Sequence, residues 1–155
     1  MSAPARGPEP LRLCLAGPSL PSQLAAVRGR MATWADGVGV ASETVDDLVL
    51  ATHEALANVA DHAYADGDSG EAMVDAELSV AGEIVVVVRD RGRWRAPAAD
   101  PGWRGRGLLI IRGLADAVEL HHDDSGTTVE MRWRLPASPD GASRDAPHWH
   151  ERRDG

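Results

Sequence analysis

The segment Thr127–Leu135, TTVEMRWRL, alternates two kinds of side chain along its whole length. Every second side chain of a β-strand points to the same face of its sheet. One face would carry Thr127, Val129, Met131, Trp133 and Leu135, and the other Thr128, Glu130, Arg132 and Arg134. A strand of this kind is typical of a sheet with one face buried and one face in water. The fold must therefore cover one side of a sheet only.

Other segments supply the rest of the sheet and the helices that would cover it. The predicted strands are 11–15, 71–80, 83–90 and 118–121, and the predicted helices are 22–36, 42–64 and 106–118, with Ser22 as an N-cap. Strand 83–90, EIVVVVRD, is apolar enough to be buried on both faces and forms a hairpin with 71–80. These elements predict an α/β (α+β) fold, a two-layer sandwich whose mixed, mostly antiparallel sheet is covered on one face by helices.

The chain length sets the domain organisation. A chain of 155 residues that is 43% hydrophobic suits one domain with one core. Residues 1–9 are rich in Pro, Ala and Gly, and 136–155 mix Pro, Ser, Asp and Arg without an apolar period. We expect a flexible N-terminus at 1–9, a folded domain at 10–135 and a disordered tail at 136–155.

Charge and hydropathy argue against two classes of partner. The net charge of -8 and the pI near 5.1 do not suit binding to nucleic acid or to an anionic membrane. The longest apolar run, Ile84–Val88, is far shorter than the roughly 20 residues of a membrane span. The N-terminus lacks the layout of a secretory signal, and Cys14 has no second cysteine to pair with. We expect a cytoplasmic protein without nucleic-acid or membrane partners.

The absence of lysine excludes two kinds of phosphate site. All sixteen basic residues are arginine. A P-loop and a eukaryotic-type protein kinase each need a lysine beside the nucleotide phosphates. Any phosphate site in this chain must use backbone N–H groups and arginine.

Helix 42–64 carries a polar pair, Glu54 and Asn58, about 40° apart on a helical wheel. The pair points away from the apolar stripe formed by Leu48, Val49, Thr52, Leu56, Val59 and Ala63. One interpretation is a solvated helix face, where such residues are common. The other is a site in which the amide holds Mg²⁺ and the carboxylate orients a hydroxyl, as phosphoryl transfer requires.

Three further motifs have both a structural and a functional interpretation. Asp90 in DRG could start a turn, or accept a hydrogen bond from the exocyclic amine of adenine while Gly92 lets the backbone approach the ring. GRGL, residues 105–108, could simply begin a helix, or offer N–H groups and Arg106 to phosphates. Thr127 in GTT could be an ordinary strand residue.

The order of these motifs resembles that of the GHKL (Bergerat-fold) ATPase superfamily over residues 51–135. EALAN resembles its N-box, DRG and GRGL its first and second glycine motifs, and GTT its closing threonine. The compact pattern E-x-x-x-N-x-x-x-H-A-Y, D-x-G-x-W-R, G-R-G-L and G-T-T-V is similar to the bacterial anti-sigma factor serine/threonine kinases.

The resemblance implies a role for each matching position. Glu54 would be the general base and Asn58 the Mg²⁺ ligand. Asp90 would read adenine, with Gly92 shaping the pocket and Thr127 on the adenine side. The phosphate-facing residues would be Gly105, Arg106, Gly107 and Leu108. The implied cofactors are ATP and Mg²⁺, the implied partners are a STAS-type anti-sigma factor antagonist and a sigma factor, and a homodimer is compatible with the family.

Two departures from the family pattern keep two hypotheses open. Trp94 replaces a second glycine of the first glycine motif, and the lid between Arg95 and Arg104 is short. The first hypothesis is a kinase that phosphorylates the antagonist and sequesters a sigma factor. The second is a nucleotide-binding or nucleotide-free module that acts by protein contact only, for which Glu54 would not be needed.

Overall fold

The computed structural model describes residues 7–16, 20–62, 71–91 and 106–136. The elements are β1 (Leu11–Ala16), α1 (Leu20–Gly37), α2 (Ser42–His62), β2 (Glu71–Leu78), β3 (Glu83–Asp90), α3 (Arg106–Leu114), β4 (Ala117–Asp123) and β5 (Gly126–Arg134). Within these ranges, none of the helices is both long and apolar enough to cross a membrane. Most of the predicted terminal segments, 1–9 and 136–155, lie outside the described residues, so those boundaries stay predictions.

The five strands form one sheet in the order β1-β2-β3-β5-β4. Every neighbouring pair is antiparallel, so among the described strands the sheet is antiparallel and not mixed. The predicted β2–β3 hairpin is confirmed, and the Ser79 amide donates to the Glu83 carbonyl at 2.9 Å. Gly82 completes the turn with a φ of +77°, a conformation that glycine adopts without strain.

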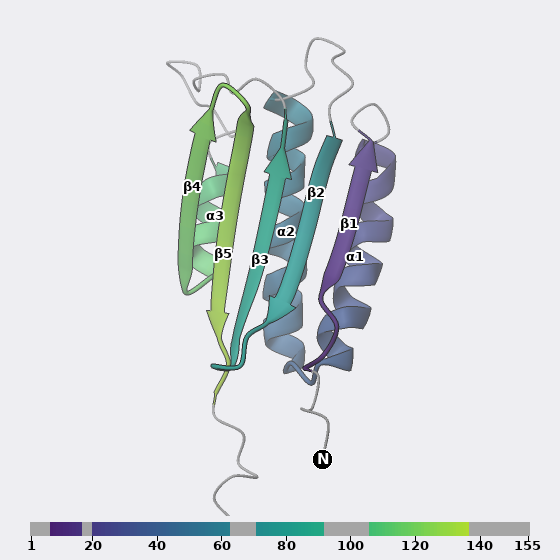
Figure 1. The fold of residues 1–155 in the computed structure, drawn as a ribbon, viewed down its shortest axis with the longest axis vertical. Coiled ribbons are helices and arrows are strands. Elements are labelled where there is room, and N and C mark those ends of the chain that lie inside the picture. Colours follow the sequence, from purple (N-terminus) through teal and green to yellow (C-terminus); the bar gives the residue numbers. More distant parts are fainter. Residues whose placement is uncertain (1–6, 17–19, 63–70, 92–105, 137–155) are drawn as a thin grey trace, which may run out of the picture.

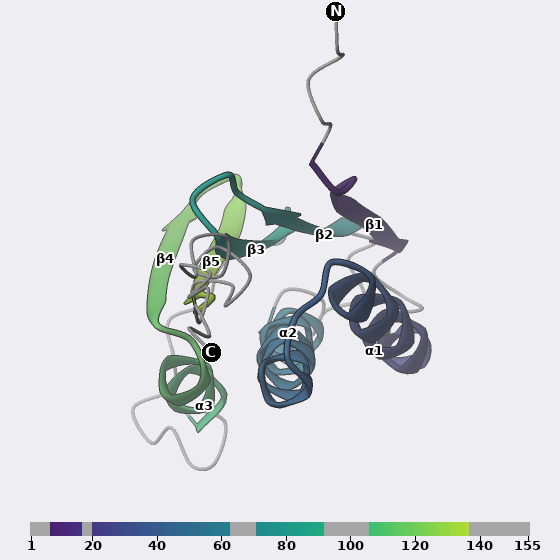
Figure 2. The same cartoon turned by 90° about the horizontal axis from the view of Figure 1, so that it is seen from below.

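All three helices lie on one face of the sheet, as Figures 1 and 2 show. The core between the two layers consists of apolar side chains from alternate strand positions and from the helix faces above them. Its fully buried members include Val74, Ile84, Val86, Met131, Met31, Leu48, Leu56 and Ile111. Burial of each large apolar side chain contributes about 1.5–3 kcal/mol. The predicted two-layer sandwich is confirmed.

The central strand β3 differs from its prediction. Its buried residues alternate with partly exposed ones, so Val86 and Val88 face the core whereas Val85 and Val87 lie on the open face. Burial on both faces was therefore the wrong prediction. The reason is that the described helices pack on one face only, which the apolar content of a strand does not report.

The two long helices are present as predicted, and the predicted end of α2 at residue 64 lies outside the described residues. Helix α2 begins at Ser42 as predicted, and the Val45 amide donates to the Ala41 carbonyl at 3.0 Å. Helix α1 begins at Leu20, which places Ser22 inside the first turn. The predicted N-cap at Ser22 is therefore wrong.

Helix α3 ends at Leu114, earlier than the predicted residue 118, and β4 is longer than predicted. The indole N–H of Trp133 donates to the Leu114 carbonyl at 2.9 Å. The Asp116 amide donates to the Arg132 carbonyl at 2.9 Å. Both bonds join this segment to β5, so the chain leaves the helix where β5 offers hydrogen-bond partners.

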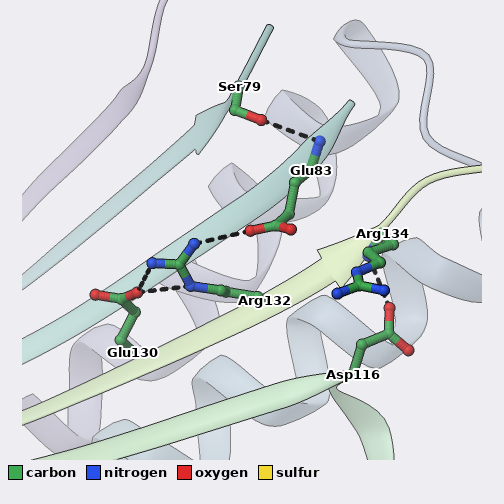
Figure 3. A network of polar contacts seen from close by, with 6 residues as sticks. All are labelled: Ser79, Glu83, Asp116, Glu130, Arg132 and Arg134. Atoms are coloured by element: carbon green, nitrogen blue, oxygen red, sulfur yellow. Dashed lines mark hydrogen bonds and ion pairs between the residues drawn. The ribbon is translucent and has the colours of Figure 1, made fainter. Parts of the chain in front are cut away.

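The open face of the sheet carries an arginine network, shown in Figure 3. Arg132 of β5 contacts Glu130 on its own strand and donates to Glu83 of β3 at 2.9 Å. The hydrogen bonds to Glu83 and then Glu130 raise the pKa of Arg132 above its ordinary value. Asp116 accepts from the Arg134 backbone amide at 2.7 Å. This polar face agrees with the alternation of TTVEMRWRL.

Candidate active site

Glu54 and Asn58 lie on α2, the middle helix of the layer in Figure 2. Both side chains are partly exposed, whereas Thr52 and Leu56 on the same helix are buried in the core. The predicted direction of the polar pair, away from the apolar stripe, is therefore confirmed. Ala63 of that stripe lies outside the described residues.

The start of α3 packs against Asn58 of this polar pair. Gly107 is buried, and a Cβ built on it would lie 2.9 Å from Asn58 Nδ2 and 3.0 Å from Asn58 Oδ1. Arg106 is exposed as the first residue of α3, and Leu108 is partly buried. The structure thus brings part of GRGL directly onto the EALAN helix. Gly105 lies outside the described residues.

Asp90 and Thr127 meet at one end of the sheet. They are opposed in the antiparallel register of β3 and β5. Asp90 is only 7% exposed, and it continues the buried set Ile84, Val86 and Val88, so its side chain is on the helix-covered face. A buried carboxylate beside a hydroxyl provides acceptors for a polar ligand group. Gly92, the other predicted adenine-site residue, lies outside the described residues.

Gly126 is a residue that the sequence analysis did not include in the site. Its φ is +143°, and an added Cβ would lie 1.9 Å from the Asp90 carbonyl oxygen. Only glycine therefore allows β5 to begin this close to the end of β3. The glycine of GTT was visible in the sequence, but its role depends on the pairing of β5 with β3.

The two groups of residues lie at the same end of the molecule and on the same side of the sheet. In Figure 1, β3 ends, β5 begins, α2 ends and α3 begins at that end. The α2–α3 group provides a carboxylate, an amide and a helix N-terminus, and the sheet provides a buried carboxylate and a hydroxyl. Helix N-termini favour anions, and the carboxylate and amide oxygens favour hard cations.

A hollow of about 750 Å³ lies on the open face of the sheet and reaches Asp90 and Gly126, where β3 ends and β5 begins. One cross-strand row lines it: Met73, Arg89, Thr128 and His121. These residues alternate with core residues, so their side chains point away from the helices. Glu54 and Asn58 do not line this hollow. We assign the candidate site to the helix-covered face, because the motif residues converge there.

The chain is similar to known proteins over most of its length. A family model described as a histidine kinase-like ATPase domain matches residues 17–133, a span that contains every candidate residue. A protein of Oceanobacillus iheyensis named serine-protein kinase RsbW is 31% identical over 120 residues, which cover 68% of this chain and 75% of the relative. A Bacillus pumilus protein of the same name is 29% identical over 131 residues, covering 74% and 80%.

Solved structures agree with the family match. The RsbU and RsbW domains of a Mycobacterium tuberculosis protein superpose with a TM-score of 0.66 and 26% identity over 82% of this chain. The match covers 32% of that longer chain, so this protein spans about a third of it. A histidine kinase domain from Erythrobacter litoralis, at 24% identity and a TM-score of 0.55 over 75% of this chain and 61% of its own, shares the fold.

Proposed function

The chain belongs to the histidine kinase-like ATPase domain family, and from this we propose that it is an ATP-dependent serine/threonine protein kinase of the anti-sigma factor type. The observation that carries the proposal is the convergence of Asn58, Gly107, Asp90 and Thr127 at one end of the sheet. The similarity to proteins named serine-protein kinase supports the choice of reaction.

Glu54 is the proposed general base. In the reaction, the Oγ of the acceptor serine or threonine forms a bond to the γ-phosphorus of ATP. The bond from that phosphorus to the β–γ bridging oxygen breaks, ADP leaves, and Glu54 takes the hydroxyl proton. Catalysis would consist mainly of positioning and charge stabilisation. The partial exposure of Glu54 supports this role, because an acceptor protein can reach it.

Asn58 is the proposed Mg²⁺ ligand. Its amide oxygen is a hard donor, the Glu54 carboxylate is one turn away, and Gly107 has no side chain that would crowd the amide. The residues present therefore fit this cation. Mg²⁺ would supply charge neutralisation on the phosphates when it is bound.

The adenine side would be formed by Asp90 and Thr127. Asp90 would accept a hydrogen bond from the exocyclic amine, and Thr127 opposite it would contribute a hydroxyl. We include Gly92 as the residue that shapes this pocket. On the phosphate side, Gly105, Arg106, Gly107 and Leu108 would form the start of α3 that faces the anion, with Arg106 in place of the missing lysine.

We propose a cytoplasmic protein with two macromolecular partners. The phosphorylated substrate would be a small STAS-type antagonist, and the sequestered partner a sigma factor. A homodimer also belongs to this proposal. The names of the relatives support these assignments in general terms only.

Calorimetric titration of ATP into the protein, with and without Mg²⁺, tests the nucleotide site. We expect Mg²⁺ to tighten binding in the wild type and Asn58→Ala to remove that gain. If a well-folded wild type does not bind ATP at all, the kinase proposal fails and the contact-only module replaces it.

The role of Glu54 as general base is tested by measuring the transfer of labelled phosphate from ATP to a purified STAS-type antagonist. We expect Glu54→Gln to slow transfer by about 10²-fold, the usual contribution of general base catalysis, with little change in ATP affinity. Asp46→Asn, at an exposed position of the same helix, is the matched control and should keep the wild-type rate. A wild-type rate in Glu54→Gln would show that Glu54 is not the base.

A further inference from the structure

Gly107 is the glycine of α3 that touches another helix. A Cβ added there would meet three atoms of the Asn58 side chain, Nδ2 at 2.9 Å, Oδ1 at 3.0 Å and Cγ at 3.3 Å. A Cβ added to Gly113 on the same helix would meet nothing within 4 Å. The contact at Gly107 therefore belongs to this position and is not a general property of the helix.

The three distances show which group would yield to a methyl. Ordinary contacts between heavy atoms begin near 3.4 Å, so the amide would have to move by about 0.5 Å. The contacted atoms are the end of a side chain and not backbone. Asn58 is also only partly buried, so its amide has room to rotate away. An added methyl would therefore displace the amide and leave α2 and α3 in place.

We propose that Gly107 is a positioning residue that sets the orientation of the Asn58 amide through the absence of its own side chain. In this role it acts on the metal through Asn58, and an alanine at this position keeps the backbone N–H that the phosphate side would use. This inference rests on the proposed role of Asn58 as the Mg²⁺ ligand. Mg²⁺ demands near-ideal octahedral geometry at short distances, so a ligand displaced by half an ångström binds it poorly.

The same contact links two parts of the site. Arg106, the proposed phosphate-side residue, directly precedes Gly107 at the start of α3. A movement of the first turn of α3 would therefore move the surface on which the Asn58 amide rests. Through this link, binding of phosphate at the start of α3 is coupled to binding of Mg²⁺ by Asn58. Thermodynamic coupling of this kind is reciprocal, so each ligand affects the affinity for the other.

The test is an ATP titration of the full chain, with and without Mg²⁺, for the wild type, Gly107→Ala and the matched control Gly113→Ala. We expect Gly107→Ala to lose about tenfold or more in Mg²⁺-dependent affinity and to keep the Mg²⁺-free affinity within about twofold, because only the metal ligand moves. Gly113→Ala should match the wild type in both conditions.

A second readout uses the protein without nucleotide or metal. In urea unfolding, Gly107→Ala alone should leave the midpoint below the value expected from the helix propensity of alanine, because displacing the Asn58 amide costs free energy. In an Asn58→Ala background the same substitution should raise the midpoint, because the clash is gone and alanine favours a helix over glycine. Additive effects in this double-mutant cycle would overturn the inference.

The outcomes separate this inference from the proposed function. No Mg²⁺-dependent binding in the wild type would reject the metal role of Asn58 itself. Mg²⁺-dependent binding that Asn58→Ala abolishes and Gly107→Ala leaves intact would reject the positioning role alone. Loss of both Mg²⁺-free and Mg²⁺-dependent binding in Gly107→Ala would show that the contact maintains the whole site. This outcome would also reject the positioning role of Gly107.

Discussion

Asp90 and Thr127 lie directly opposite each other on β3 and β5, and the alternation of both strands places their side chains on the helix-covered face. They are separated by more than thirty residues in sequence. The antiparallel pairing therefore creates the junction between DRG and GTT. This junction lies at the end of the sheet where Asn58 meets the start of α3.

The first prediction concerns Asp90. Asp90→Asn should weaken ATP binding by about tenfold, because the hydrogen bond from the adenine amine would lose its charged acceptor. Calorimetry measures this effect. The matched control is Asp75→Asn on β2, where the carboxylate pairs with Arg12 and Arg89 on the open face. Equal losses in both variants would contradict an adenine role for Asp90.

The second prediction separates backbone strain from steric clash. Gly126→Ala should lower the free energy of unfolding by about 3 kcal/mol or more, because a Cβ would lie 1.9 Å from the Asp90 carbonyl oxygen. Gly82 has a φ of +77°, but a Cβ added there would meet no atom within 4 Å. Backbone strain alone should therefore lower the free energy of unfolding of Gly82→Ala by about 1–2 kcal/mol. Urea unfolding measures both variants. A Gly126→Ala protein as stable as Gly82→Ala would show that β5 can move away from β3.

The third prediction concerns Thr52, which is 1% exposed. Its hydroxyl has no hydrogen-bond partner within the described part of the chain. Thr52→Val has nearly the same shape and removes the unpaired hydroxyl, so it should raise the free energy of unfolding by about 1 kcal/mol. Chemical unfolding checks this value. Destabilisation by Thr52→Val would indicate that the hydroxyl has a partner.

The fourth prediction concerns pH. Hydrogen bonds from the Ser125 hydroxyl and then the Ser125 amide lower the pKa of Asp123 below its ordinary value. The folded state thus favours the carboxylate. Its stabilising effect is complete above the ordinary aspartate pKa and is lost as the pH falls through the lowered value.

An NMR titration of the Asp123 carboxyl carbon tests this assignment. Ser125→Ala removes the hydroxyl but keeps the backbone amide, so it should raise the pKa of Asp123 part of the way to its ordinary value. The same titration curve in the variant and the wild type would show that the Ser125 hydroxyl is not the cause.

Several elements were predictable because their signals are local. The alternation in TTVEMRWRL indicated a strand with one wet face, and the structure has β5 with Met131 buried and Arg132 exposed. The apolar stripe of α2 predicted that Glu54 and Asn58 point away from the core. These patterns depend only on the geometry of a strand or a helix, which is the same in every fold.

Other features required the packing of distant segments. The end of α3 depends on hydrogen bonds from Trp133 and Asp116 to partners across the α3–β5 contact. The half-exposed face of β3 depends on which side the helices cover, and a run of valines does not carry that information. A sequence reports what each segment prefers, whereas burial depends on its neighbours.

The sequence by itself determined the two layers, the wet face of the sheet and the family resemblance of EALAN, DRG, GRGL and GTT, because each rests on local periodicity or on residue order. Only the tertiary structure decided that Gly107 rests on the Asn58 amide and that Gly126 meets the Asp90 carbonyl. Both contacts join segments far apart in the chain, and their closeness is fixed by helix packing and strand register, which no single segment encodes.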